Sequence, residues 1–127
     1  SMYEWFKNTK SEFEKNDFFK IYIDFPRTDL LVRIKERAVD MLDNGAVSEV
    51  KKFMKLKVPK VKSANKAIGI NEIKEFIKKK IKIEDVIDKI SIKTRQYAKR
   101  QTTWARGNMS DWNKIKSSGL KAFLKKI

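Results

Sequence analysis

The fold is decided by residues 84–106, which read EDVIDKISIKTRQYAKRQTTWAR. One set of side chains recurs at helical spacing and traces one face: Val86, Ile87, Ile90, Thr94, Tyr97, Ala98, Gln101 and Trp104. A second set traces the opposite face: Lys89, Lys93, Gln96, Arg100 and Thr103, with Lys99 and Arg106 flanking it. This spacing predicts one long amphipathic helix that ends at Gly107-Asn108.

Shorter helices are predicted on both sides of this stretch. The first begins with Thr28 as its N-cap and stops at Gly45, and its apolar stripe is Leu30, Leu31, Ile34, Ala38, Met41 and Leu42. The second covers residues 46–56 and buries Val47, Val50, Phe53 and Met54. Ser63 caps a third, which contains Gly69 and the apolar residues Ala67, Ile68, Ile73, Phe76 and Ile77. A last amphipathic segment covers residues 117–126.

Only one segment has the alternation of a strand. In FFKIYIDFP, residues 18–26, the side chains of Phe19, Ile21, Ile23 and Phe25 fall on one side, and Pro26 closes the pattern. A further short helix is predicted around Trp5 and Phe6. We therefore expect a mostly α fold, with about four to five packed helices and one short extended segment near residues 18–25. We expect residues 1–127 to form a single helical domain.

The composition limits the chemistry that this chain can perform. It contains no Cys and no His, which excludes disulfides, thiolate nucleophiles and the commonest general base and metal ligand. Its four glycines are too far apart for a phosphate-binding loop. The carboxylate pairs Glu84/Asp85 and Asp40/Asp43 suit helix starts and solvated faces. We therefore expect no catalytic residue and no metal ligand in this segment, and a soluble cytoplasmic monomer that does not contact a membrane.

The charge is distributed unevenly. Residues 1–58 carry a net charge of +2 and residues 59–127 a net charge of +13. The lysines suit either a solvated surface or a polyanionic partner. Arginine is the sharper signal, because its planar fork grips phosphates and stacks on bases. All six arginines fall in two clusters: Arg27, Arg33 and Arg37, then Arg95, Arg100 and Arg106.

The second cluster lies on the long helix beside amides and hydroxyls. The helical spacing predicts that Tyr97 and Trp104 face inward as core anchors, in preference to serving as stacking platforms for bases. Five side chains are predicted to face outward: Gln96, Lys99, Arg100, Thr103 and Arg106. Cations combined with amides and hydroxyls can hold phosphates and read base edges, so this surface favours nucleic-acid binding.

Three motifs in order carry a resemblance to a known family. They are RIKER…MLDNGAVSEV at residues 33–50, AIGINE at 67–72 and RQYAKRQTTWAR at 95–106. Together they resemble the C-terminal half of bacterial tRNA dimethylallyltransferases (tRNA isopentenyltransferases), and SMYEW at the start resembles a weaker family segment. Members of that family transfer a dimethylallyl group from dimethylallyl diphosphate to the N6 amine of an adenosine next to the anticodon.

The resemblance implies a set of binding residues. The tRNA-contacting stretch of the family matches Lys99, Arg100, Gln101, Thr102, Thr103, Trp104 and Arg106, of which the helical spacing ranks Gln101 and Trp104 lower. A second tRNA-contacting element matches Lys66, Ala67, Ile68 and Gly69. Arg33 matches an arginine that serves the diphosphate. At Ile70 and Asn71 the chain lacks the aromatic and cationic residues of the family pattern, so contacts from these two positions are in doubt.

The resemblance also implies what this segment lacks. The diphosphate loop and the proposed general base belong to an N-terminal half, so we expect this segment to be inactive alone. Its partners would be a tRNA anticodon stem-loop and, in the complete enzyme, dimethylallyl diphosphate and Mg²⁺. Two other hypotheses remain open: a non-enzymatic basic helical module that binds nucleic acid, and a helical domain that binds an acidic protein. The apolar stripes are narrow, which argues against a membrane-surface role.

Overall fold

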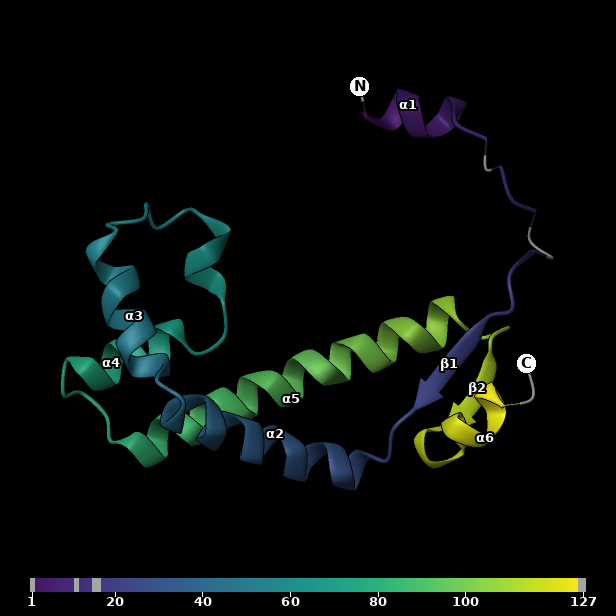
Figure 1. Cartoon of the computed structure of the whole chain (residues 1–127). Coiled ribbons are helices and arrows are strands. Elements are labelled where there is room, and N and C mark those ends of the chain that lie inside the picture. The colour runs from purple at the N-terminus through teal and green to yellow at the C-terminus, as the bar shows by residue number, and fades with distance from the viewer. Residues whose placement is uncertain (1, 11, 15–16, 126–127) are drawn as a thin grey trace. The chain divides into compact units, whose positions relative to one another are not determined.

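The computed structural model describes residues 2–10, 12–14 and 17–125. The predicted mostly helical fold class is confirmed. The elements in order are α1 (Met2–Asn8), β1 (Ile21–Asp24), α2 (Arg27–Asp43), α3 (Ala46–Lys55), the 3-10 turn η2 (Ser63–Lys66), α4 (Ile70–Ile77), α5 (Ile83–Asn108), β2 (Asn113–Lys116), the 3-10 turn η3 (Ser117–Gly119) and α6 (Leu120–Leu124) (Figure 1). None of the described helices is long and apolar enough to cross a membrane.

The chain forms two compact units. Unit 1 comprises the described residues within 1–24 and 111–127, and unit 2 comprises residues 25–110. Unit 2 is thus inserted in the sequence between the two parts of unit 1. The single domain expected for residues 1–127 stays a prediction.

Unit 1 contains a two-stranded parallel sheet. Ile21 of β1 lies opposite Asn113 of β2, and the register continues to Asp24 opposite Lys116. The predicted strand is confirmed at its centre and ends before Pro26. Its partner β2 was not predicted, because NKIK contains a single apolar residue, Ile115. Parallel strands need a long crossover, and here unit 2 is part of that connection.

Contacts on either side of the strands fix their pairing. Lys20 forms an ion pair with Asp111 (3.3 Å), and Lys114 forms one with Asp24 (3.1 Å). The backbone N–H of Asn113 donates to the carbonyl of Lys20. The ring of Phe19 stacks on that of Phe123, with 5.6 Å between their centroids. The described part of the predicted segment 117–126 is helical in η3 and α6, and residue 126 lies outside the described residues.

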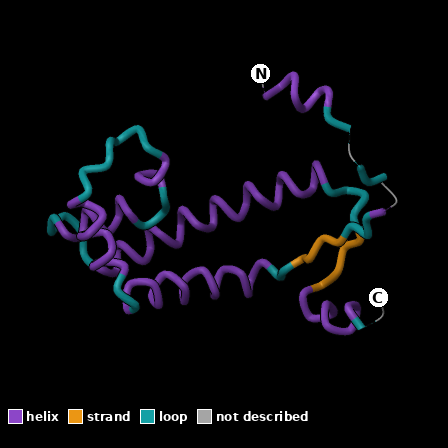
Figure 2. The backbone as a smooth tube through the Cα atoms, turned by 45° about the horizontal axis from the view of Figure 1, so that its top comes forward, coloured by secondary structure: helices purple, strands orange, loops and turns teal. Residues whose placement is uncertain are grey.

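Unit 2 is built on two antiparallel helices. Helices α2 and α5 pack side by side (Figures 1 and 2), and α3 and α4 pack on one another, with α4 also contacting α5. The core combines residues of α2, α3, α4 and α5: Ala38, Ala46, Val50, Ile73, Val86 and Ile90. Val86 and Ile73 are almost completely buried. All but Ala46 belong to the predicted apolar stripes, so the core of unit 2 was largely predicted.

Two helix starts differ from prediction. Pro26, not Thr28, is the N-cap of α2, and its carbonyl accepts the N–H of Leu30 at 3.0 Å. The Thr28 hydroxyl lies within the first turn and donates to Asp29. The third predicted helix is interrupted, because Ser63 begins only the turn η2 and the helix restarts at Ile70.

The turn between α4 and α5 holds a lysine in a left-handed conformation. Lys79 has φ +56°, and its N–H donates to the carbonyl of Phe76 while that of Lys80 donates to Glu75. This pair of bonds is the Schellman motif, which usually has glycine at the left-handed position. Lys57, after α3, has φ +49°. A non-glycine residue in this region costs about 1 kcal/mol.

Candidate nucleic-acid interface

The second half of α5 presents an exposed polar surface. We define the outer face of α5 as the side chains of Gln96, Lys99, Arg100, Thr103 and Arg106. All five are exposed, as predicted. On the other side of the helix, Ala98 and Thr102 are half-buried and Ala105 is buried. At 26 residues α5 is about 39 Å long. The outer face is thus held on a single continuous element.

Three residues predicted to point inward are exposed. Tyr97 is 50% exposed and Trp104 is 59% exposed, and Gln101 is also exposed. The prediction that the two aromatics are core anchors is wrong for the described chain. Gln101 and Trp104 were ranked lower as contacts because they were expected to point inward; that reason does not hold, and their role as contacts stays a prediction. The guanidinium of Arg100 lies 5.8 Å from the centroid of the Tyr97 ring. Exposed aromatic faces beside cations suit the stacking of unpaired bases.

The error arises from a shift of one residue in the packed stripe of α5. Beyond Ile90 and Thr94, the buried line continues through Ala98, Thr102 and Ala105. These side chains are small, so they form a weak apolar stripe. Helical spacing allows steps of three or four residues. The prediction followed the larger residues Tyr97 and Trp104 and not the small residues next to them.

The two threonine hydroxyls near the outer face each donate a hydrogen bond to a backbone carbonyl of α5. Thr103 Oγ1 donates to the carbonyl of Lys99 at 3.0 Å, and Thr102 Oγ1 donates to that of Ala98 at 3.1 Å. A hydroxyl that donates its proton in this way still presents its lone pairs. Thr103 can therefore accept a hydrogen bond from an RNA 2′-hydroxyl or an exocyclic amine, while Arg100 and Arg106 can only donate.

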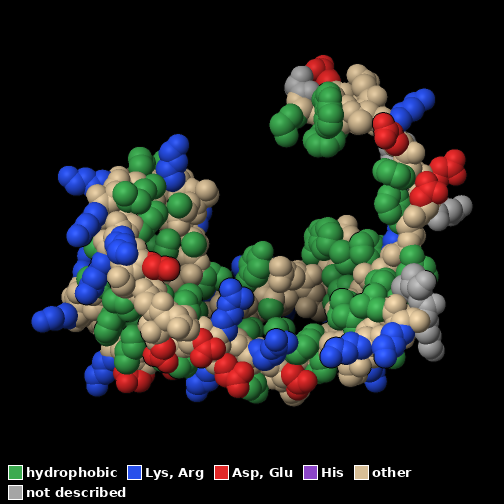
Figure 3. All heavy atoms as spheres, viewed as in Figure 1, with side chains coloured by type: hydrophobic (Ala, Val, Ile, Leu, Met, Phe, Trp, Pro, Cys, Tyr) green, Lys and Arg blue, Asp and Glu red, His purple; other side chains and the backbone are tan. Residues whose placement is uncertain are grey.

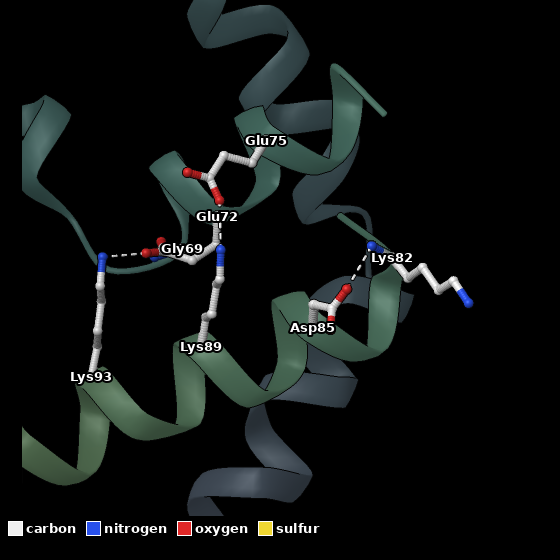
Figure 4. A network of polar contacts seen from close by, with 7 residues as sticks. All are labelled: Gly69, Glu72, Glu75, Lys82, Asp85, Lys89 and Lys93. Carbon is white, nitrogen blue, oxygen red and sulfur yellow. Dashed lines mark hydrogen bonds and ion pairs between the residues drawn. The ribbon is translucent and has the colours of Figure 1, made fainter. Parts of the chain in front are cut away.

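Lys89 and Lys93, the first two residues of the predicted polar face of α5, have a different role. Lys89 Nζ lies 2.8 Å from Glu75 Oε2, and Lys93 forms an ion pair with Glu72, so both lysines contact carboxylates of α4 (Figure 4). The hydrogen bond to Glu75 raises the pKa of the Lys89 ammonium. The stripe that looked uniform in sequence is thus divided: Lys89 and Lys93 hold α4, and the side chains from Gln96 onward face solvent.

Glu72 connects α5 to the loop before α4. One oxygen of its carboxylate accepts the backbone N–H of Gly69 at 2.9 Å, and the other accepts the ammonium of Lys93 (Figure 4). Burial by itself raises the pKa of Glu72. The hydrogen bonds from Lys93 and from the N–H groups of Glu72 and Gly69, together with the Lys93 charge, outweigh burial and lower this pKa. Glu72 is a buried, ionised link between two segments that sequence analysis selected separately.

Gly69 is the N-cap of α4. The prediction that it lies inside a helix is wrong. Its φ of +105° is rarely adopted by other residues. A Cβ at this position would lie 3.4 Å from Met41 Cε and 3.6 Å from Ile90 Cδ1. These are ordinary contact distances, so the positive φ, and not a lack of space, is what requires glycine at this position.

We expect Gly69→Ala to lower the free energy of unfolding by about 2 kcal/mol, because alanine is strained at this φ. Chemical denaturation followed by circular dichroism measures the change. Gly107→Ala is the matched control, because a Cβ at Gly107 has no neighbour within 4 Å and φ there is ordinary. Equal effects of the two substitutions would contradict the role assigned to Gly69.

The other residues of the second element lie on the surface. Lys66 ends η2, and Ala67 and Ile68 form the link to Gly69; all three are exposed. Asn65 supports the turn before them, since its amide donates to the carbonyl of Pro59 at 3.0 Å. Because Glu72 joins Gly69 to Lys93, the end of this segment at Gly69 is linked to α5. Sequence analysis missed Glu72 itself, although it fills the last position of the AIGINE motif.

Arg33 lies on the exposed side of α2. Its guanidinium is 5.1 Å from the centroid of the Phe25 ring, a stacked position that leaves the N–H edges available for an anion. Because α2 and α5 are antiparallel, the first turns of α2 and the last turns of α5 lie toward the same end of unit 2, where the two helices diverge (Figure 1). The two arginine clusters are therefore brought to one end of unit 2.

Among the described residues, no three acidic side chains come together in a group that could hold a metal ion.

Comparison with known proteins identifies the family of this chain. A family model described as IPP transferase matches residues 1–108. The chain belongs to the IPP transferase family. The tRNA dimethylallyltransferase of Pelagibacter ubique (strain HTCC1062) is 50% identical over all 127 residues, which cover 41% of that protein. That of Ehrlichia canis (strain Jake) is 36% identical over 104 residues, or 82% of this chain and 35% of the relative.

Solved structures agree with this membership in the IPP transferase family. A tRNA isopentenylpyrophosphate transferase of Staphylococcus epidermidis matches with a TM-score of 0.68 and 32% identity, over 79% of this chain and 32% of that one. The full-length enzyme of Bacillus halodurans matches with a TM-score of 0.68 and 28% identity, over 90% and 36%. This IPP transferase chain thus spans less than half the length of these relatives. The family match includes both residues 66–69 and the outer face of α5.

Proposed function

We propose that this chain is the tRNA-binding portion of a tRNA dimethylallyltransferase and that it binds an anticodon stem-loop. The observation that carries the proposal is the outer face of α5, where exposed Arg100 and Arg106 accompany amide and hydroxyl groups on one helix. Membership in the IPP transferase family supports tRNA as the nucleic acid. Exposed Tyr97 and Trp104 would add stacking surfaces for bases of the loop.

In this proposal the described residues bind and orient, and the chemistry takes place in the complete enzyme. The N6 amine of an adenosine forms a bond to the dimethylallyl carbon, the carbon–oxygen bond to diphosphate breaks, and the amine loses a proton. Diphosphate is the leaving group, and Arg33 is the residue of this chain proposed to contact it. Holding the two reactants in register can supply several kcal/mol of the barrier. Because the adenosine must leave its stack, residues 66–69 and the outer face of α5 would hold the loop open.

The complete enzyme is proposed to require Mg²⁺ and dimethylallyl diphosphate and to act in the cytoplasm as a monomer. This chain by itself is proposed to bind RNA without catalysing transfer.

The test is the binding of this chain to an anticodon stem-loop with adenosines in its loop, compared with an RNA duplex of equal length. We expect tighter binding of the stem-loop, with a preference that persists when the salt concentration is raised. Fluorescence anisotropy at two salt concentrations measures both properties. Equal binding of the two RNAs, lost alike in high salt, would contradict the proposal, because contacts made by charge alone do not distinguish shape.

A further inference from the structure

A second basic surface lies at the other end of α5. A groove of about 860 Å³ is formed by α3, the end of α4, the following turn and the start of α5. Four lysines line it: Lys51, Lys79, Lys80 and Lys82. Many blue side chains gather over this end of unit 2 in Figure 3. None of the four corresponds to a residue already placed in the proposed tRNA interface.

The charge of the groove is available to a ligand. Within the described residues, none of the four lysine side chains has a carboxylate partner. Glu84 and Asp85 also line the groove, and Asp85 accepts the backbone N–H of Lys82 at 2.9 Å, so two carboxylates accompany the four ammonium groups. The groove therefore keeps an excess of positive charge, which suits a partner with several negative groups.

The floor of the groove is apolar. Val47, Phe76, Ile77 and Ile81 line it and remain half-buried. A duplex offers phosphate ridges and keeps its bases stacked inside, so it cannot use an apolar depression. An unpaired strand can place a base against such a floor while its phosphates contact the surrounding lysines.

We propose that this groove binds an unpaired segment of the same RNA, with phosphates on Lys51, Lys79, Lys80 and Lys82 and a base face against Phe76 and Ile81. The inference rests on the proposed function, because it takes the partner from the outer face of α5. The groove reaches the N-cap of α5 at Lys82, and the outer face lies on the second half of the same helix, so Lys82 and Lys99 are about 25 Å apart along its axis. An RNA bound at the outer face therefore needs only a strand of that length to enter the groove.

Lys79 allows a test in which stability and binding change in opposite directions. Because Lys79 is left-handed, Lys79→Gly relieves strain and is expected to raise the melting temperature of the chain by a few degrees. The same substitution removes a cation from the groove, so affinity for an unpaired strand is expected to fall. A residue with a purely structural role would not show this combination.

The probes are the anticodon stem-loop alone and the same stem-loop with an unpaired extension long enough to span the 25 Å, attached at either end. We expect one extension to raise affinity about tenfold. We also expect it to steepen the slope of log affinity against log salt by about 0.7 for each phosphate neutralised. Lys79→Gly should reduce this gain, and adding Lys80→Ala and Lys82→Ala should abolish it, while binding of the unextended stem-loop stays the same.

Lys57→Gly is the matched control. Lys57 is also left-handed and does not line the groove, so its replacement should raise the melting temperature and leave the gain from the extension intact. An extension that adds no affinity, or a gain that survives in the triple variant, would overturn the groove assignment alone. A gain that falls equally in Lys57→Gly would also overturn it.

Two further outcomes separate the alternatives. If polyglutamate binds the chain more tightly than the extension does, and Lys79→Gly abolishes that binding, the groove takes an acidic protein and the RNA assignment is overturned. If the unextended stem-loop does not bind, the proposed function fails, and the groove inference fails with it.

Discussion

Glu72→Ala is expected to lower the free energy of unfolding by about 2–4 kcal/mol. The substitution removes the acceptor of the buried Gly69 N–H and the carboxylate that pairs with Lys93. Lys93 is half exposed and can be rehydrated, so most of the loss comes from the unsatisfied N–H and the lost link to the start of α4. Urea denaturation followed by circular dichroism measures the change.

Two controls separate the roles of this carboxylate. Glu72→Gln keeps an acceptor for Gly69 and removes the charge, so it should lose less stability than Glu72→Ala. Glu75→Ala removes the exposed partner of Lys89, and such surface pairs contribute less than about 1 kcal/mol. If Glu75→Ala were as damaging as Glu72→Ala, burial would not be the reason for the effect.

The ionisation of Glu72 gives this effect a pH dependence. Its pKa is lower in the folded chain than its ordinary value, so the folded state binds the proton less tightly than the unfolded state does. The stabilisation is therefore present above the ordinary pKa of a glutamate and is lost as pH falls through the lowered value. In Glu72→Gln this component of the acid-induced loss of stability should be missing.

The second large effect is expected for Arg100→Ala combined with Arg106→Ala. Each guanidinium can contact phosphate or base edges bidentately, and their joint removal should weaken stem-loop binding about ten- to a hundredfold. Both side chains are exposed, so the helical circular dichroism should not change. Fluorescence anisotropy with the anticodon stem-loop measures the loss.

Lys121→Ala combined with Lys125→Ala is the control for net charge. These two lysines lie in and just after α6, both are exposed, and their removal changes the charge by the same amount. We expect at most a small loss of affinity. Equal losses from both pairs would indicate a general polycation, and no loss from the arginine pair would remove the outer face of α5 from the interface.

The helices of unit 2 were predictable because their apolar stripes have a clear period. Ala38, Val50, Ile73 and Val86 fall on stripes that also carry larger apolar residues, and all four form the core. The second half of α5 was less predictable, because its buried positions are Ala98, Thr102 and Ala105. Small residues bury little apolar surface, so they leave a weak periodic signal even at positions that the fold buries.

The strand β2 and the break at Gly69 depend on contacts distant in sequence. Ile115 is the single apolar residue of β2, and the strand exists because β1 lies beside it. Gly69 takes its positive φ where the side chains of Met41 and Ile90 approach, and both come from other helices. The local sequence pattern therefore indicates neither the strand β2 nor the break at Gly69.

The candidate site was predicted as two separate segments, and the structure supplies their connection. Lys99, Arg100, Thr103 and Arg106 were placed on the exposed surface correctly. That Glu72 links Gly69 to α5 could not be derived from composition, because Lys93 is 21 positions away from Glu72. The sequence signal for part of this link is the spacing of Glu72 three residues after Gly69, which is that of a capping box.

The insertion of unit 2 between β1 and β2 has a consequence for the order of folding. In the unfolded chain, pairing Ile21 with Asn113 requires closing a loop of about ninety residues, and the entropy lost grows with the logarithm of loop length. Once α2 and α5 have packed antiparallel, residues 25 and 110 lie at the same end of unit 2, and most of that entropy has already been lost. We therefore expect the packing of α2 against α5 to precede the pairing of β1 with β2 and to make that pairing kinetically accessible.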